Sequence, residues 1–190
     1  MTQDFIMKNP KKGLTDVTVI ILMFTNILLW MSTIMRTSGP SIRADDAKTC
    51  AKKWLETALE TSDFDVKISS MMEHVDSEPL LITRNKFASM LPCITHVNLY
   101  NNSFAGKHTL AYVLPWAYSN KMWVNSRLWN SQNTAEKAYT IIHECTHLAL
   151  KMNDYAYLSQ EKYANLRGYN ATHNADTITK IIANINYFNC

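Results

Sequence analysis

The sequence predicts an α+β protein in which one transmembrane helix precedes a mostly helical domain with a small β-sheet. Three observations lead to this prediction. Residues 17–35 form an uncharged, largely apolar run. Apolar residues recur at helical spacing in 47–61 and 139–150. The stretches 110–114 and 121–125 have the composition of short strands and are joined by a proline-containing turn.

The run at 17–35 has the length of a membrane-spanning helix. Its nineteen residues are bounded by Asp16 and Arg36. At a rise of about 1.5 Å per residue they extend over about 28 Å, close to the thickness of a bilayer's hydrocarbon core. A buried core helix is the alternative, which we disfavour because the run is apolar on all sides.

Basic residues are more frequent before this span than after it. Three lysines (Lys8, Lys11 and Lys12) precede it and two arginines (Arg36 and Arg43) follow it. This positive-inside bias places the amino terminus in the cytoplasm and the domain outside, in the periplasmic or extracellular space. A cleavable signal peptide is the alternative, but no A-x-A pattern follows the apolar run. We expect a cytoplasmic tail at 1–16, an uncleaved signal anchor at 17–35, a linker at 36–46 and one domain at 47–190.

The elements of the domain follow from the same patterns. In the first helix, Trp54, Leu55, Ala58 and Leu59 fall on one face. The two strands form a hairpin whose edge can pair with an extended peptide. We expect helices at 47–61, 85–90, 139–150, 155–166 and 176–186, and strands at 110–114 and 121–125.

The strongest chemical signal is the pentapeptide His143-Glu144-Cys145-Thr146-His147 on the expected helix 139–150. Residues four apart lie on the same face of an α-helix, so both imidazoles can bind one metal ion. Glu144 can orient a water on the metal and accept its proton. The alternative is an ordinary amphipathic helix with hydrogen-bonded histidines. We disfavour it because the motif lies on a predicted helix, as its mechanism requires.

A hydrolytic zinc site takes a third protein ligand. The downstream candidates are Asp154, Glu161, His173 and Asp176. In an unbroken helix Asp154 would lie about 10 Å beyond His147, whereas a metal–oxygen bond is only about 2 Å long. The chain must therefore turn back between Lys151 and Asn153, and Asn153 suits this turn because asparagine tolerates the left-handed conformation. If 154–157 forms a helical turn, Asp154 and Tyr157 can both face the ion.

All four cysteines, Cys50, Cys93, Cys145 and Cys190, follow the apolar run. An even number in an exported domain predicts disulfide bonds, with three possible connectivities. Cys145 lies about 200° around the helix from His143, so it points away from the metal face and is packed or bridged rather than a ligand. A bridge between Cys145 and Cys190 is our hypothesis.

The segment 141–157, IIHECTHLALKMNDYAY, resembles the active-site segment of the aspzincins, the deuterolysin and peptidyl-Lys metalloendopeptidases. In that family the third zinc ligand is an aspartate in a G-T-x-D-x-x-Y-G motif. Further similar segments extend the resemblance over 50–188. They are CAKKWL at 50–55, AYVLP at 111–115, KMWVNSRLW at 121–129, Asn174-Ala175-Asp176 and Phe188.

The resemblance implies a zincin-like metallopeptidase domain that hydrolyses peptide bonds with one catalytic zinc ion. It implies zinc ligands His143, His147 and Asp154, the general base Glu144, and Tyr157 as the group that stabilises charge on the carbonyl oxygen. Lys151-Met152 stands where the family has Gly-Thr, and Leu158 replaces the closing glycine. Glu161 is the competing third ligand, which we disfavour because only Asp154 has a tyrosine three residues later.

The resemblance also concerns specificity. Peptidyl-Lys members hold the substrate lysine with acidic side chains of the Asn-Ala-Asp segment. This makes Asp176 a candidate substrate-binding residue and implies a preference for lysine after the cleaved bond. Thr179 stands where a second acid is expected. The alternative for Asp176 is a helix cap or a structural hydrogen-bond acceptor.

The sequence thus predicts a membrane-anchored zinc endopeptidase that acts on peptides or proteins outside the cytoplasm. A net charge of +3 without a clustered basic face gives no support for a nucleic-acid partner, and we expect none. The alternative from another class is a catalytically inactive zincin-like domain that binds a peptide or protein.

Overall fold

The computed structural model describes residues 39, 41–62, 84–102 and 108–190. They belong to Gly39–Cys190, one of two units into which the chain divides, the other being Met1–Ser38. The expected cytoplasmic tail and signal anchor lie outside the described residues, so they stay predictions. Within the described ranges, no helix is both long and apolar enough to cross a bilayer.

Helices and one small sheet make up the described fold, so the mostly helical α+β class is confirmed for this part of the chain. The α-helices are α2 (Asp45–Glu60), α4 (Arg84–Ala88), α5 (Leu91–His96), α6 (Ser126–Asn130), α7 (Thr134–Cys145), α8 (Gly168–Thr172) and α9 (Ala175–Ile185). Two further turns are η1 (Thr146–Leu150), which is π-helical, and η2 (Glu161–Asn165), a 3-10 helix. The strands are β1 (Ser41–Ile42), β2 (Asn98–Asn101), β3 (Ala111–Val113) and β4 (Lys121–Val124).

The sheet has the strand order β1-β2-β4-β3, so β3 forms one edge. Strand β2 is parallel to β4 and pairs Leu99 with Met122, whereas β3 is antiparallel to β4 and pairs Tyr112 with Trp123. The predicted hairpin is therefore confirmed. Because β4 covers one side of β3 within the described sheet, the other side keeps backbone groups that can pair with an extended peptide.

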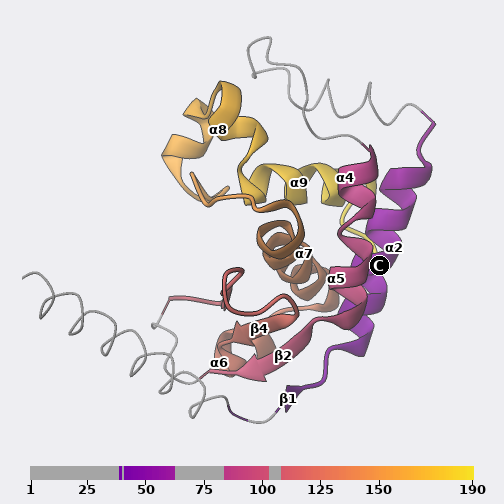
Figure 1. The fold of residues 1–190 in the computed structure, drawn as a ribbon, viewed down its shortest axis with the longest axis vertical. Helices are drawn as coiled ribbons and strands as arrows, with labels where there is room; N and C mark the ends of the chain where they lie inside the picture. Colours follow the sequence, from indigo (N-terminus) through magenta and orange to yellow (C-terminus); the bar gives the residue numbers. More distant parts are fainter. Residues whose placement is uncertain (1–38, 40, 63–83, 103–107) are drawn as a thin grey trace, which may run out of the picture. The chain divides into compact units, whose positions relative to one another are not determined.

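Helix α7 carries the histidine motif at the centre of the described fold. Figure 1 shows it end-on between the sheet and α9, with α2 alongside, and it packs against both helices. Ile141 and Ile142 are fully buried on it. Its first turn is fixed by a capping box, in which Asn133 and Glu136 each accept a hydrogen bond from the other's backbone N–H. The helix expected at 139–150 is present, but it begins earlier and its last turn is π-helical.

The prediction of a helix at 155–166 is wrong, since only the short turn η2 forms within this range. The reason is a buried side chain from a distant part of the sequence. The Oδ1 atom of Asn174 accepts hydrogen bonds from the backbone N–H groups of Tyr155 (2.9 Å) and Ala156 (3.1 Å), and its Nδ2 donates to the carbonyl of Ala156 (2.9 Å). These hydrogen bonds hold Tyr155 and Ala156 beside Asn174 in a conformation that is not helical.

Two disulfides, Cys50–Cys190 and Cys93–Cys145, join all four cysteines. The hypothesised bridge between Cys145 and Cys190 is wrong. Cys145 is fully buried on α7, which packs against α5, where Cys93 lies. The carboxyl-terminal tail instead runs beside α2, whose Lys53 and Trp54 side chains donate hydrogen bonds to the last two backbone carbonyls. The expectation that Cys145 is bridged and is not a ligand is confirmed.

Candidate active site

The two histidines of the motif point toward a common space. His143 lies on α7 and His147 on the π-helical turn η1. Their Nε2 atoms are 3.2 Å apart, and only 10% and 13% of the two side chains is exposed. Single π-helical turns within helices often occur at functional sites. The helix therefore presents two imidazole nitrogens to one point, as the spacing predicted.

The chain reverses directly after η1, as the sequence required, but a different residue makes the turn. Lys151 is left-handed with a φ of 58°. Asn153, the residue expected to take this conformation, instead pairs as a β-bridge with Asn174. The reversal brings Asp154 back to the helix, with its Oδ1 atom 3.2 Å from Nε2 of His143 and 3.3 Å from Nε2 of His147.

The left-handed turn gives a stability prediction. Lys151→Gly is expected to raise the free energy of unfolding by about 1 kcal/mol. A non-glycine residue in this conformation costs about 1–2 kcal/mol, and glycine removes that cost. Part of the stabilisation is offset because glycine increases the conformational entropy of the unfolded chain. Lys137→Gly, in the middle of α7, should have the opposite sign and about the same size. Urea denaturation of both variants measures this. Equal destabilisation by the two changes would contradict the strained turn.

The three facing atoms fit a zinc ion. A tetrahedral site with bonds of about 2.0–2.1 Å has edges of about 3.3–3.4 Å between neighbouring ligand atoms. The three observed separations are 3.2, 3.2 and 3.3 Å. Among the described residues, His143, His147 and Asp154 form a group whose ligand atoms are close enough together to hold one metal ion. Glu161, the competing third ligand, lies exposed on η2 outside this group.

Each histidine is held at its other ring nitrogen. Nδ1 of His147 donates to the carbonyl oxygen of Met152 at 2.7 Å, since a carbonyl can only accept. Nδ1 of His143 donates to Oδ1 of Asp176 at 2.8 Å. A proton on Nδ1 leaves the lone pair of Nε2 available to a metal ion, and such partners fix the ring and strengthen the ligand. Both imidazoles are thus oriented for metal binding by the fold.

Asp176 is buried, with 5% of its surface exposed. Its Oδ1 atom is bound by His143, and its Oδ2 accepts a hydrogen bond from the backbone N–H of Leu158 at 2.7 Å. The Tyr139 hydroxyl lies 3.4 Å from Oδ1. Both carboxylate oxygens therefore have donors within the protein. This geometry favours the structural acceptor that we considered for Asp176 over a group that binds substrate.

Tyr157 reaches the site without the helical turn considered above, because 154–157 is not helical. Its hydroxyl donates to Oδ2 of Asp154 at 2.8 Å, and its ring stacks on His143 at 5.9 Å between centroids. With 42% of its surface exposed, the phenol also lines the neighbouring cavity. The hydrogen bonds of Asn174 to the preceding two residues set this position.

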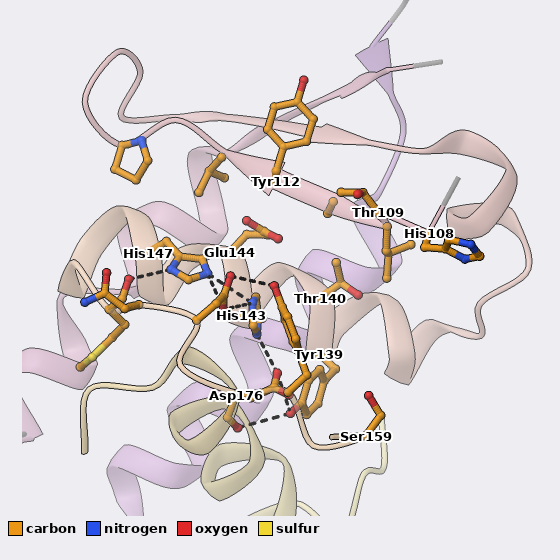
Figure 2. Close-up of a pocket in the computed structure, with 18 residues that line it drawn as sticks. His108, Thr109, Tyr112, Tyr139, Thr140, His143, Glu144, His147, Ser159 and Asp176 are labelled. Atoms are coloured by element: carbon orange, nitrogen blue, oxygen red, sulfur yellow. Dashed lines mark hydrogen bonds and ion pairs between the residues drawn. The ribbon is translucent and has the colours of Figure 1, made fainter. Parts of the chain in front are cut away.

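A cavity of about 800 Å³ opens at the metal-binding group. Figure 2 shows His143, Glu144 and His147 together beneath it, with Tyr112 of the edge strand β3 on the opposite wall. Glu144 is 5% exposed and lines the cavity. A peptide that pairs with the edge of β3 would therefore pass over the histidines and Glu144.

The charged groups of the site shift one another's pKa values. Burial lowers the pKa of His143, but hydrogen bonds with Asp154 and Asp176 outweigh it and raise that pKa to about 10. Burial raises the pKa of Asp154, but hydrogen bonds from both histidines hold it well below its usual range. Burial raises the pKa of Glu144. Asp154 thus stays ionised and attracts positive charge, which a divalent cation can supply.

A sequence model of the lysine-specific metallo-endopeptidases, the aspzincins, matches residues 43–180. The chain belongs to this family. The resemblance described from the motifs is thereby confirmed, and the aspzincin is a zinc metalloendopeptidase that acts on peptide or protein substrates. Zinc as the cofactor is supported by the family and by the group of His143, His147 and Asp154.

The aspzincin is also similar to a solved structure, a zinc peptidase from Grifola frondosa, at 17% sequence identity and a TM-score of 0.46. The similarity covers 74% of this chain and 92% of that one. Comparison with curated proteins gives no match.

Two contributions to the site were missed in the sequence. Asn174, fully buried, holds the segment that carries Asp154 and Tyr157. It belongs to the Asn-Ala-Asp segment of the family resemblance, which was a usable signal. The carbonyl of Met152 orients His147, and no sequence signal exists for it because every residue has a carbonyl.

Proposed function

We propose that His143, His147 and Asp154 hold the catalytic zinc ion of this aspzincin, with Glu144 as general base and Tyr157 as oxyanion donor. The observation that carries the proposal is the triangle of ligand atoms with edges of 3.2–3.3 Å. The hydrogen bonds on both Nδ1 atoms support it, because they leave each Nε2 free for the ion.

Bound zinc supplies Lewis acidity, which makes water easier to deprotonate and polarises a carbonyl group. Glu144 accepts the proton of the attacking water and delivers a proton to the departing amine. Burial raises the pKa of its carboxyl group.

The Tyr157 hydroxyl donates a hydrogen bond to the carbonyl oxygen as negative charge develops there. Burial, followed by the hydrogen bond to Asp154, raises the pKa of Tyr157, so the phenol keeps its proton at neutral pH. Its exposed position on the cavity leaves room for a carbonyl beside it. The phenol can therefore exchange Asp154 for the substrate oxygen as its acceptor.

Asp154→Asn is expected to weaken zinc binding by more than about 100-fold. Loss of a residue that only contacts a metal ligand already weakens binding by about 10–100-fold, and Asp154 is proposed as a ligand itself. Glu161→Gln should leave the zinc affinity unchanged, because Glu161 is exposed on η2. Competition with a chromophoric chelator measures both affinities without any substrate. A large loss in Glu161→Gln with none in Asp154→Asn would assign the third ligand to the wrong carboxylate.

We also propose that the domain works outside the cytoplasm. The two disulfides support this location, because such bonds persist in oxidising compartments. Anchoring in a membrane through 17–35, with 1–16 in the cytoplasm, is the matching proposal for the amino-terminal part.

The family description names lysine specificity, and the sequence suggested Asp176 as the group that would bind the lysine. We propose instead that Asp176 positions His143 in this chain. Its two oxygens are already bound by Nδ1 of His143 and the N–H of Leu158. Asp176 is also almost fully buried, so little of either oxygen is accessible to a lysine ammonium.

A further inference from the structure

We propose that Phe188 and Tyr139 are positioning residues of the zinc site. Phe188 lies in the segment 186–190, which we call the tail. Tyr139 contacts both Phe188 and Asp176, the residue that orients His143. The inference rests on the proposed function, because it concerns how one of the proposed zinc ligands is held. It goes beyond that function by giving a part in metal binding to a segment that does not line the cavity.

The tail is attached to helix α2 at both of its ends. The disulfide Cys50–Cys190 joins its last residue to the helix. Nε1 of Trp54 donates a hydrogen bond to the carbonyl of Asn189 at 2.6 Å, and Nδ2 of Asn186 donates to the carbonyl of Trp54 at 2.9 Å. Figure 1 shows the tail in yellow, leaving α9 and ending beside α2. The tail therefore has a fixed path along this helix.

The backbone of the tail is strained between these attachments. Tyr187 and Phe188 are both left-handed, with φ values of 50° and 55°. Residues with a Cβ atom seldom adopt this conformation, because Cβ comes too close to the following carbonyl oxygen. Such strain persists only where the surrounding structure imposes it, and it is often found near functional sites. We therefore looked for what the strained residues contact.

The ring of Phe188 packs against two aromatic side chains of the domain. It meets Trp54 edge-on, with 5.9 Å between the centroids and 82° between the planes. It lies parallel to Tyr139, at 6.3 Å and 9°. Aromatic pairs in both arrangements attract at such separations. The neighbouring side chain of Tyr187 is 83% exposed. Phe188 thus connects α2 with the Tyr139 ring on α7.

The hydroxyl of Tyr139 lies at the limit of hydrogen-bonding distance from Asp176. It is 3.4 Å from Oδ1 and 3.4 Å from the backbone carbonyl oxygen of that residue, whereas O–H···O bonds are usually about 2.7–2.8 Å long. Figure 2 shows the two side chains next to each other beside His143. A small shift of the ring away from Asp176 would break the contact. The stacking with Phe188 therefore decides whether Tyr139 can donate.

The oxygen that Tyr139 approaches is the one that holds the zinc ligand. Oδ1 of Asp176 accepts a hydrogen bond from Nδ1 of His143 at 2.8 Å, and Oδ2 accepts one from the backbone N–H of Leu158 at 2.7 Å. A donor from Tyr139 restrains the carboxylate further, and the carboxylate in turn restrains the imidazole. Partners that fix a metal-binding histidine raise its affinity for the ion. The tail thereby supports zinc binding from outside the cavity.

Single substitutions test the two residues by competition with a chromophoric chelator. Tyr139→Phe removes only the hydroxyl and is expected to weaken zinc binding about three- to tenfold, less than the loss of a direct partner of the histidine. Phe188→Ala leaves the hydroxyl but removes the ring that places it, so the same loss is expected. Phe188→Tyr keeps the ring and should bind zinc as the wild type does. Tyr187→Ala is the matched control, an exposed aromatic residue of the same tail, and should also leave the affinity unchanged.

The double variant Tyr139→Phe/Phe188→Ala distinguishes positioning from a general loss of stability. If Phe188 acts through the hydroxyl, the double variant loses no more zinc affinity than either single variant. Additive losses, or wild-type affinity in either single variant, overturn the inference. Urea denaturation identifies the variants that are folded. Phe188→Leu takes the place of Phe188→Ala if the latter does not fold, since it keeps an apolar side chain without the flat ring.

Peptide hydrolysis separates this inference from the proposed function. Zinc affinity is measured without substrate, so a wild type that binds zinc but cleaves no peptide refutes the proposed function and leaves the affinities to decide the inference. A wild type that cleaves peptides, together with wild-type zinc affinity in Tyr139→Phe, overturns the inference alone. A wild type that binds no zinc overturns both.

Discussion

Glu144→Gln is expected to lower kcat/KM for peptide hydrolysis by about 10²–10⁴-fold, the usual contribution of a general base. Glutamine is nearly isosteric with glutamate but cannot accept the proton of water. Glu144 is almost fully buried on the cavity wall and is not part of the ligand triangle. The variant should therefore retain the zinc content of the wild type. Rates on one peptide and zinc by mass spectrometry measure the two quantities.

Glu136→Gln is the matched control for this experiment. It lies on the same helix, is exposed, and its capping interaction can be made by glutamine as well. Its activity should equal that of the wild type. An unchanged rate in Glu144→Gln with zinc present would remove Glu144 from the mechanism. Loss of zinc in that variant would show that the side chain acts on the metal site.

Local spacing explains why part of the site could be predicted. The spacing of His143 and His147 depends only on helical geometry, and it survives the change to a π-helical turn. The distance argument for Asp154 required a reversal after the helix, and the reversal is present. Both inferences used the rise and periodicity of a single helix.

The features that could not be predicted depend on residues far apart in the sequence. The helix predicted at 155–166 does not form at its start, where Asn174 binds the backbone N–H groups of Tyr155 and Ala156. Asn174 lies nineteen and eighteen residues after these two residues. The disulfide partner of Cys145 depends on which helix packs behind α7. Lys151 adopts the left-handed turn although Asn153 has the better intrinsic preference, because Asn153 is held by pairing with Asn174. Tertiary contacts outweigh local preference in each case.

Asp176→Asn is expected to weaken zinc binding by about 10–100-fold, the range found for partners of metal-binding histidines. The carboxylate accepts from two donors, Nδ1 of His143 and the N–H of Leu158. An asparagine has one accepting oxygen and one donating NH₂, so one of the two donors must face another donor in either orientation. Removing the negative charge also weakens the ligand basicity of His143. Chelator competition at fixed pH gives the affinity.

The need to accept hydrogen bonds from two donors at once distinguishes Asp176 from a residue that only binds substrate. If it positions His143, Asp176→Asn weakens zinc binding in the absence of peptide and lowers stability by about 1–3 kcal/mol through the unpaired donor. If it binds a substrate lysine, zinc affinity stays at the wild-type value and only KM for lysine peptides rises. Asp46→Asn, an exposed aspartate in the first turn of α2, controls for the loss of one charge. Wild-type zinc affinity in Asp176→Asn would return the residue to the substrate-binding role.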